Sequence, residues 1–171
     1  MPRTSLLPLL IPLVLQLVAC KQAEVAPLIA IAPPAANRFA PESAKPGESI
    51  AGLEVVSAQL AQSSVNSAYV GWVQFSGEVV VEGVPTIIES NEPEFLCFNV
   101  DEDTENLLPR MRHDDRRVWF CFTNQVDARL ALSDLIGQQV RIRISEFRTV
   151  YEFTDAFDTA RFEGIFTGVT N

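Results

Sequence analysis

The sequence predicts a mainly β domain with five strands, a short helix before the first strand and a second helix between the third and fourth strands. Apolar and polar residues alternate strictly over residues 140–145, which is the pattern of a half-buried strand. The runs 95–100 and 118–123 are rich in aromatic and β-branched residues, which favour strands. Gly77 interrupts a β-type run over residues 73–82 and indicates a bulge or bend there.

The two helices are predicted from weaker signals. A short helix of modest propensity is expected within residues 57–68, with Val56 and Leu60 along one side. A second helix is expected over residues 126–136, followed by Gly137, because helix C-termini commonly end in a left-handed glycine. Its inward-facing side chains are expected to be Leu130, Leu135 and Ile136.

The chain order of these elements predicts the architecture. The expected strands are residues 73–82, 95–100, 118–123, 140–145 and 162–166, with 84–88 available for further pairing, a long hairpin loop over 101–117 and an irregular connection over 146–158. A helix, three strands, a second helix and two strands is the chain order of a five-stranded OB-like Greek-key barrel.

Short motifs in the chain resemble those of the bacterial lipoproteins and periplasmic proteins called tRNA_anti-like, which have an OB fold. The motifs are Leu60, Asn66-Ser67-Ala68-Tyr69-Val70-Gly71, Gly77-Glu78-Val79, a Cys-Phe pair at Cys97-Phe98 or Cys121-Phe122, and Gly137-Gln138-Gln139-Val140. Trp72 stands where the family usually has lysine. Because members of this family largely lack an assigned activity, the resemblance implies a fold for residues 57–166 and no RNA-related activity.

The N-terminus resembles the signal of a bacterial lipoprotein. Arg3 precedes an apolar run over residues 6–19, which ends in Leu17-Val18-Ala19-Cys20. In bacterial lipoproteins this pattern marks a cysteine that is lipidated and becomes the mature N-terminus. A membrane-spanning helix is the alternative, but the run is shorter than the roughly 20 apolar residues that a span needs and contains two prolines. Lys21, rather than aspartate, follows Cys20, and in Gram-negative lipoproteins this favours the outer membrane.

These features predict three regions. Residues 1–19 are expected to be a lipoprotein signal peptide, and residues 20–48 to be the lipidated cysteine with a semi-rigid tether rich in proline and alanine. Residues 49–171 are expected to form the OB-like domain. The protein is therefore expected in the bacterial cell envelope, anchored by lipid at the outer membrane and facing the periplasm.

The remaining two cysteines, Cys97 and Cys121, are predicted to form a disulfide, because an exported protein folds in an oxidising compartment. Two buried thiols in different strands are the alternative. An antiparallel pairing of Cys97 with Cys121 would also place Asp101 opposite Arg117, Glu102 opposite Arg116 and Asp103 opposite Asp115, and the two attractive pairs out of three support the register.

The net charge restricts the classes of partner. The formal net charge of the chain is −9, with 22 acidic and 13 basic residues. Neutralisation of phosphates by basic residues supplies most of the affinity for nucleic acid, so we expect no nucleic-acid partner. An anionic membrane surface is excluded for the same reason, which leaves the lipid anchor as the expected membrane contact.

Two groups of residues are candidates for a binding surface. Trp119, Phe120 and Phe122 form the first group, on the strand 118–123, whose two faces are both apolar. OB barrels bind oligonucleotides or oligosaccharides on the face of strands two and three, so this group is either a ligand surface or ordinary core covered by residues 147–157. The second group, Arg110, Arg112 and His113, is expected at the tip of the 101–117 loop.

No residues predict catalysis, a metal or a cofactor. His113 is the only histidine, and its expected place in a charged loop does not provide the shielded pocket that acid–base catalysis needs. Asp101, Asp103 and Glu105 alternate, but they lack the glycine and the terminal glutamate of a calcium-binding loop. We therefore expect a non-catalytic binding or scaffolding module for a protein or a cell-wall glycan. The alternative is an inhibitor or immunity lipoprotein that acts against a basic envelope-directed hydrolase.

Overall fold

The computed structural model describes residues 37–64, 69–89, 94–151 and 157–167. The expected signal peptide, Cys20 and the first part of the tether lie outside these residues, as does the Asn66-Ser67-Ala68 part of the family motif. Within the described ranges, no helix is long and apolar enough to cross a membrane.

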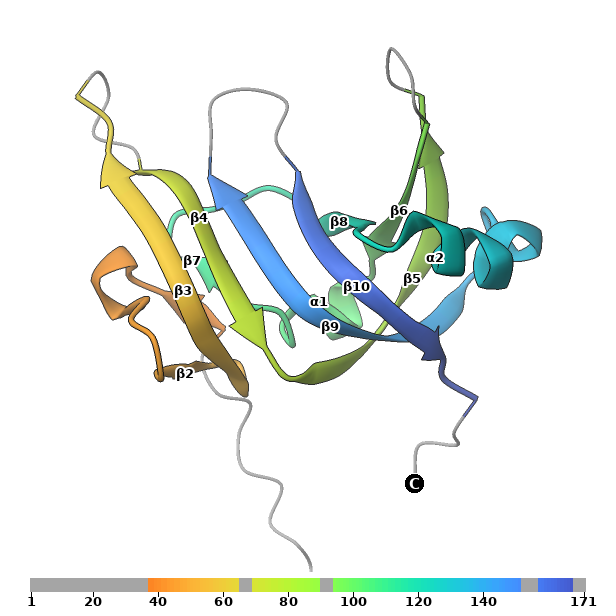
Figure 1. Ribbon diagram of the computed structural model, residues 1–171, viewed down its shortest axis with the longest axis horizontal. Helices are drawn as coiled ribbons and strands as arrows, with labels where there is room; N and C mark the ends of the chain where they lie inside the picture. The colour runs from red at the N-terminus through yellow and green to blue at the C-terminus, as the bar shows by residue number, and fades with distance from the viewer. Residues whose placement is uncertain (1–36, 65–68, 90–93, 152–156, 168–171) are drawn as a thin grey trace, which may run out of the picture. The chain divides into compact units, whose positions relative to one another are not determined.

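The prediction of a mainly β domain is confirmed. The strands are β1 (Arg38–Phe39), β2 (Ser49–Ile50), β3 (Leu53–Gln62), β4 (Tyr69–Ser76), β5 (Glu78–Ile88), β6 (Phe95–Val100), β7 (Arg110–Met111), β8 (Trp119–Phe122), β9 (Val140–Tyr151) and β10 (Asp158–Ile165). The helices are α1 (Glu102–Glu105) and α2 (Gln125–Leu132), with 3-10 turns η1 (Pro41–Ser43) and η2 (Ser133–Leu135). Figure 1 shows β3, β4, β9 and β10 side by side.

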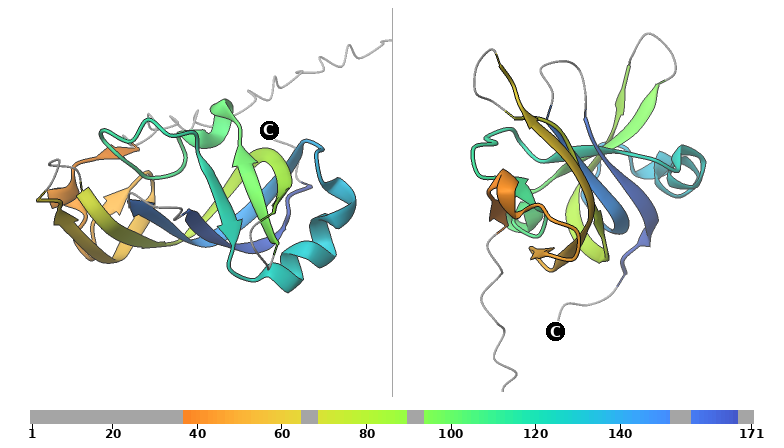
Figure 2. Two further views of the ribbon diagram at one scale, coloured as in Figure 1. Left: turned by 90° about the horizontal axis from the view of Figure 1, so that it is seen from above. Right: turned by 60° about the vertical axis from the view of Figure 1, so that its left-hand side comes forward.

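The strand pairings close a ring. β5 pairs antiparallel with β6, β6 pairs antiparallel with β8, and β8 runs parallel to β10. β10 then pairs antiparallel with β9, which returns antiparallel to β5. α2 lies beside this ring, whereas β2 and β3 lie at the opposite side of the domain (Figure 2).

The bend expected at Gly77 is confirmed, and it divides one long run of chain into two strands of the same sheet. β4 and β5 both pair with β9, with Gln74 opposite Arg148 before the bend and Glu78 opposite Ser145 after it. Gly77 has a φ of 107°, a conformation that glycine adopts without the steric cost of a side chain. β5 therefore belongs to the ring, while β4 continues beyond it and pairs with β3.

The prediction of a helix within residues 57–68 is wrong for its described part. Residues 57–62 belong to β3, which pairs with β4 from Glu54 to Gln62. Leu53 and Val55 are buried, but a register shift between Val55 and Ser57 interrupts the alternation that would have indicated a strand. Ala58 and Leu60 pack against the core, so pairing and burial outweigh the modest helix propensity of this segment.

The folded unit also begins earlier than residue 49. Residues 37–48 were expected to belong to the tether, but Phe39 is 4% exposed and packs edge-on against Phe75. β1 runs parallel to β7, and the Arg110 amide donates a hydrogen bond of 2.8 Å to the Asn37 carbonyl. The prolines in this segment therefore do not prevent it from packing on the domain.

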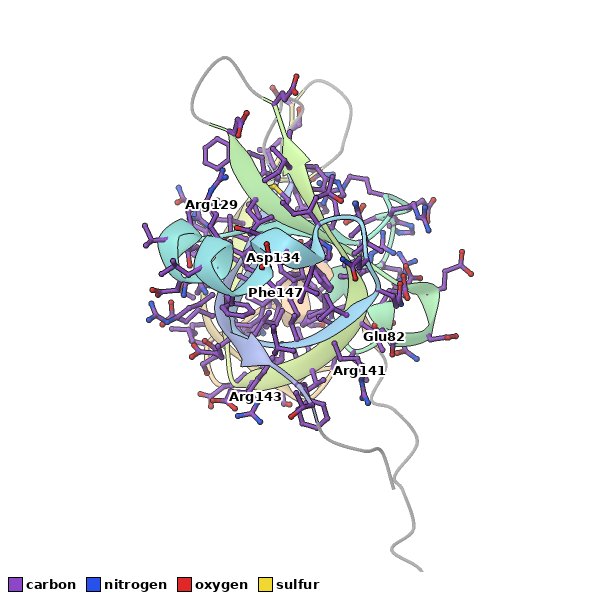
Figure 3. The ribbon with its side chains drawn as sticks, turned by 90° about the vertical axis from the view of Figure 1, so that its right-hand side faces the viewer. Glu82, Arg129, Asp134, Arg141, Arg143 and Phe147 are labelled. Carbon is purple, nitrogen blue, oxygen red and sulfur yellow. A yellow bond between two sulfur atoms is a disulfide. The ribbon has the colours of Figure 1, made fainter. Side chains whose placement is uncertain are left out.

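α2 presents a different face to the core from the one expected. Ala128 and Leu132 are buried, whereas Leu130 is 83% exposed and Ile136 is 42% exposed. Leu135 does pack against the core. The Gln125 side chain fixes the start of the helix, because its Oε1 accepts from the Leu96 amide and its Nε2 donates to the Leu96 carbonyl. Figure 3 shows Phe147 among the side chains behind α2.

The segment 101–117 is not a simple hairpin loop. It contains α1 and β7. The pairing of β6 with β8 ends at the hydrogen bond that the Val100 amide donates to the Val118 carbonyl. Glu102 lies in α1, so the predicted cross-strand pairs of Asp101 with Arg117 and Glu102 with Arg116 are wrong. Arg116 instead pairs with Asp114 at 2.8 Å.

Candidate functional site

The disulfide between Cys97 and Cys121 is present and lies at the centre of the β6–β8 pair. The two cysteines face each other across the antiparallel ladder, as the predicted register requires. Both are buried, at 2% and 1% exposure. The covalent link therefore fixes these two neighbouring strands to each other at one point of the ring.

Three aromatic side chains lie around this disulfide. Phe95 and Trp119 are on the same faces of their strands as Cys97 and Cys121, because side chains alternate along a strand. The Phe157 ring lies 5.5 Å from the Phe95 ring and 5.9 Å from the Trp119 ring, measured between centroids. All three residues are half-buried. We call Phe95, Trp119 and Phe157 the aromatic surface.

Polar groups border the aromatic surface. Asn99 is exposed and lies opposite Trp119, and its Nδ2 donates a hydrogen bond of 2.9 Å to Thr86 Oγ1 on β5. Beside Phe95, the Arg129 guanidinium donates a hydrogen bond of 2.6 Å to the Glu94 carbonyl. The surface thus combines apolar ring faces with an amide whose oxygen is available as an acceptor.

Phe120 and Phe122, which the sequence placed with Trp119, point the other way. They are 0% and 3% exposed, and their rings pack against Phe98 at 5.7 and 6.3 Å. Period-two alternation puts both of them on the inner face of the ring. They belong to the core rather than to a binding surface.

The three residues of the predicted basic group on the 101–117 segment also differ in exposure. Arg112 and His113 are exposed, in a turn after β7. Arg110 is buried, and its guanidinium lies 3.8 Å from Asp114 and 3.9 Å from Glu105. Arg110 is therefore a structural residue, and only Arg112 and His113 remain accessible to a partner.

A second polar site lies where β9 ends and β10 begins, with two largely buried carboxylates and an exposed arginine. Arg116 makes two hydrogen bonds to the Asp114 carboxylate, at 2.8 and 2.9 Å, and a third of 3.0 Å to the Val150 carbonyl. Its guanidinium also lies 3.8 Å from Asp158. The hydroxyl of the buried Tyr151 accepts a hydrogen bond of 2.7 Å from the Met111 amide. We call Asp114, Arg116, Tyr151 and Asp158 the charge cluster.

The two carboxylates of the charge cluster have opposite pKa shifts. Burial raises the pKa of Asp158 to about 6, against the lowering effects of a hydrogen bond from the Val150 amide and the charge of Arg116. Burial also acts to raise the pKa of Asp114, but the hydrogen bonds and charge of Arg116 outweigh it and leave that pKa below its ordinary value. Hydrogen bonding to Asp114 raises the pKa of Arg116, and burial raises the pKa of Tyr151.

Residue patterns did not identify the members of this cluster or the role of Phe157. Asp158 lies in a stretch without regular alternation, and its burial depends on the parallel pairing of β10 with β8. No apolar run flanks Asp158 in the sequence, so no local signal indicated its burial. For Phe157, the aromatic content of residues 147–157 was the available signal that this segment packs on other aromatic residues.

Neither a metal site among the described residues nor a known relative indicates what these two sites do. Within the described ranges, no three histidine, cysteine, aspartate or glutamate side chains are grouped so that they can hold a metal ion. None of the family models, curated proteins and solved structures compared with the chain matches it.

Proposed function

We propose that this chain is a non-catalytic binding module of the bacterial cell envelope, which is anchored by a lipid on Cys20 and binds a cell-wall glycan through the aromatic surface. The observation that carries the proposal is the aromatic surface itself. Two of its three half-buried rings, Phe95 and Trp119, lie on strands that the disulfide joins, and the Phe157 ring packs on both, so the surface is preorganised and loses little freedom when a ligand binds.

The chemistry of the surface favours a glycan. Sugar rings have apolar faces that stack on aromatic side chains, and their hydroxyl groups need hydrogen-bond partners at the edge of the stack. Asn99 and Thr86 provide such partners beside Trp119. A ligand that combines flat apolar faces with hydroxyls matches this arrangement better than a purely apolar ligand does.

We also propose that the ring is an OB-like Greek-key barrel. Its strand order, β5-β6-β8-β10-β9 and back to β5, with one parallel pair between β8 and β10, supports this assignment. In OB folds the face of the second and third strands binds oligosaccharides or oligonucleotides. β6 and β8 are the second and third strands of the ring, and they carry Phe95 and Trp119.

A binding assay tests the proposal directly. Full-length protein in detergent is incubated with insoluble peptidoglycan, and the bound fraction is measured for the wild type and for Trp119→Ala. We expect Trp119→Ala to lower the affinity about 5- to 160-fold, because stacking on one aromatic ring contributes on the order of 1–3 kcal/mol. Trp72→Ala is the matched control, since Trp72 lies on β4 and stacks with Arg148 instead. Equal binding by wild type and Trp119→Ala would refute the proposed glycan surface.

The net charge of −9 favours a second candidate, an inhibitor of a basic envelope-directed hydrolase. Association of an acidic protein with a basic one is accelerated by electrostatic attraction and slows steeply as salt is added. A strongly salt-dependent association with a basic hydrolase such as lysozyme, together with loss of that enzyme's activity, is the expected result for this candidate. Association that does not change between low and high salt would exclude it.

A further inference from the structure

We propose that Asp158 makes the aromatic surface sensitive to pH, because uptake of one proton by its carboxyl group favours the arrangement in which Phe157 packs on Phe95 and Trp119. The link to ligand binding rests on the proposed function, but the proton-dependent packing does not. The proton-dependent packing is inferred from Phe157 and Asp158, which are adjacent in the chain and whose side chains point in opposite directions.

Phe157 and Asp158 are neighbours in the chain at the start of β10. Phe157 contributes its ring to the aromatic surface, whereas Asp158 lies opposite Phe120, a core residue, and its side chain is only 12% exposed. A movement that brings the Asp158 carboxyl into water must also move the backbone that carries Phe157. The protonation state of the inner side chain is therefore coupled to the position of the outer ring.

The Asp158 carboxyl group joins β10 to the end of β9. Its Oδ1 accepts hydrogen bonds from the Val150 amide at 2.8 Å and from the Thr149 hydroxyl at 3.2 Å. Thr149 is 1% exposed, so these bonds form away from water. Among the described residues, these two hydrogen bonds attach Asp158, the first residue of β10, to the end of β9.

The charges around Asp158 do not fully compensate its ionised form. Arg116, at 3.8 Å, is the one cation that faces it among the described residues, and this guanidinium makes its two short hydrogen bonds to Asp114 instead. Asp114 adds a second negative charge to the cluster, and Arg110 lies on the far side of Asp114. Tyr151 is the remaining titratable group beside Asp158. An ionised Asp158 thus shares its only counter-ion with another carboxylate.

The direction of the pH effect follows from linkage. In the packed arrangement, burial raises the pKa of Asp158 to about 6, whereas a solvated aspartate has its ordinary pKa of 3.8. The packed arrangement therefore binds the proton more tightly, and lowering the pH favours it. From these two pKa values, the ratio of packed to detached arrangements rises about tenfold between pH 7.5 and pH 5.

Amide hydrogen exchange at Val150 measures this ratio without any ligand. The Val150 amide is protected while it donates to Asp158 and exchanges when that contact opens. In the full-length protein in detergent, the exchange rate divided by the intrinsic rate at each pH is expected to fall about tenfold from pH 7.5 to pH 5. A protection factor that is the same at both pH values would overturn the proposal.

Two variants assign the effect to Asp158. Asp158→Asn keeps the shape of the side chain and cannot ionise, so its Val150 protection is expected not to change with pH. Asp127→Asn, at an exposed carboxylate on α2, is the matched control and is expected to keep the tenfold change. A pH dependence that survives in Asp158→Asn would show that another group is responsible and would overturn the proposal.

Peptidoglycan binding at the two pH values separates this inference from the proposed function. If Val150 protection changes tenfold but neither pH supports binding, the glycan proposal fails while the proton-dependent packing stands. If binding through Trp119 is observed but protection does not change, the proposed function stands and the inference about Asp158 fails.

Discussion

Two glycines allow backbones to approach more closely than any other residue would permit. A Cβ atom at Gly83 would lie 2.0 Å from the Asn99 carbonyl oxygen, and one at Gly71 would lie 1.8 Å from the Gln59 carbonyl oxygen. Gly83 marks the point where β5 changes partner, since it pairs with Val140 of β9 and with Val100 of β6. The ring can close there because this residue has no side chain.

We expect Gly83→Ala to lower the free energy of unfolding by about 2–3 kcal/mol, because the new methyl group meets a backbone carbonyl that cannot move without breaking strand pairing. Urea denaturation measures the change. Gly137→Ala is the control: its Cβ would meet nothing within 4 Å, so the variant bears only the cost of a φ of +78°, about 1 kcal/mol. A Gly83→Ala variant as stable as the wild type would show that the two strands can separate there without cost.

At the scale of elements, the β6–β8 pair and α2 are stabilised in different ways. The β6–β8 pair is short, and the disulfide between Cys97 and Cys121 links it across 24 residues of sequence. α2 has only eight residues and depends on the burial of Ala128 and Leu132. A helix of this length is not stable by itself in water, so its stability comes from packing.

Removal of the disulfide by the double variant Cys97→Ala and Cys121→Ala is expected to lower the free energy of unfolding by about 3 kcal/mol. The physical reason is that the link restricts the unfolded chain over a loop of 24 residues. Chemical denaturation of oxidised protein measures the change. The wild type treated with reductant should show the same loss, and a wild type unaffected by complete reduction would contradict the expectation.

Two leucines of α2, two positions apart, are expected to respond differently to truncation. Leu132 is 0% exposed, so Leu132→Ala is expected to cost about 2–5 kcal/mol through lost burial and a cavity. Leu130 is 83% exposed, so Leu130→Ala is expected to change stability by less than about 0.5 kcal/mol. Thermal unfolding of the two variants distinguishes them. Equal losses would mean that the outer side of the helix is covered in the native protein.

At the scale of the whole molecule, the folded unit and the predicted anchor lie close together in sequence. The described fold begins at residue 37 and the predicted lipidation site is Cys20, so residues 37–48 belong to the domain and not to the predicted 20–48 tether. A fully extended chain spans about 3.5 Å per residue, so if Cys20 carries the predicted lipid, the 17 residue steps from Cys20 to Asn37 allow the domain to reach at most about 60 Å from the membrane surface.

Mass spectrometry of the mature N-terminus tests the predicted anchor. We expect cleavage between Ala19 and Cys20 and a mass increase that corresponds to acyl chains on Cys20. Cys20→Ser is expected to abolish the lipid and release the protein from the membrane fraction, because the acyl chains are the predicted membrane contact. An unmodified Cys20, or cleavage at another position, would contradict the lipoprotein prediction.

Sequence patterns predicted what depends on neighbouring residues and missed what depends on distant ones. The alternation over residues 140–145 and the bend at Gly77 are local signals, and the structure confirms both. The distant pairing of Cys97 with Cys121 is the exception, because it was predicted from the two remaining cysteines and the expected oxidising compartment. The burial of Phe120 and of Asp158 depends on which face of a closed ring each residue occupies. The strand β3 was missed because a register shift disturbs its alternation, and its pairing with β4 decides its conformation.

The closure of the ring has a consequence for the order of folding. β10 pairs with both β8 and β9, and among the described strands it comes last in sequence, so the contacts that complete the ring form between residues 158–165 and the segments that precede them. Pairings between distant segments form slowly, since a long loop must close first. Until residues 158–165 pair, β8 and β9 consequently present open edges, and a chain that lacks these residues cannot complete the ring.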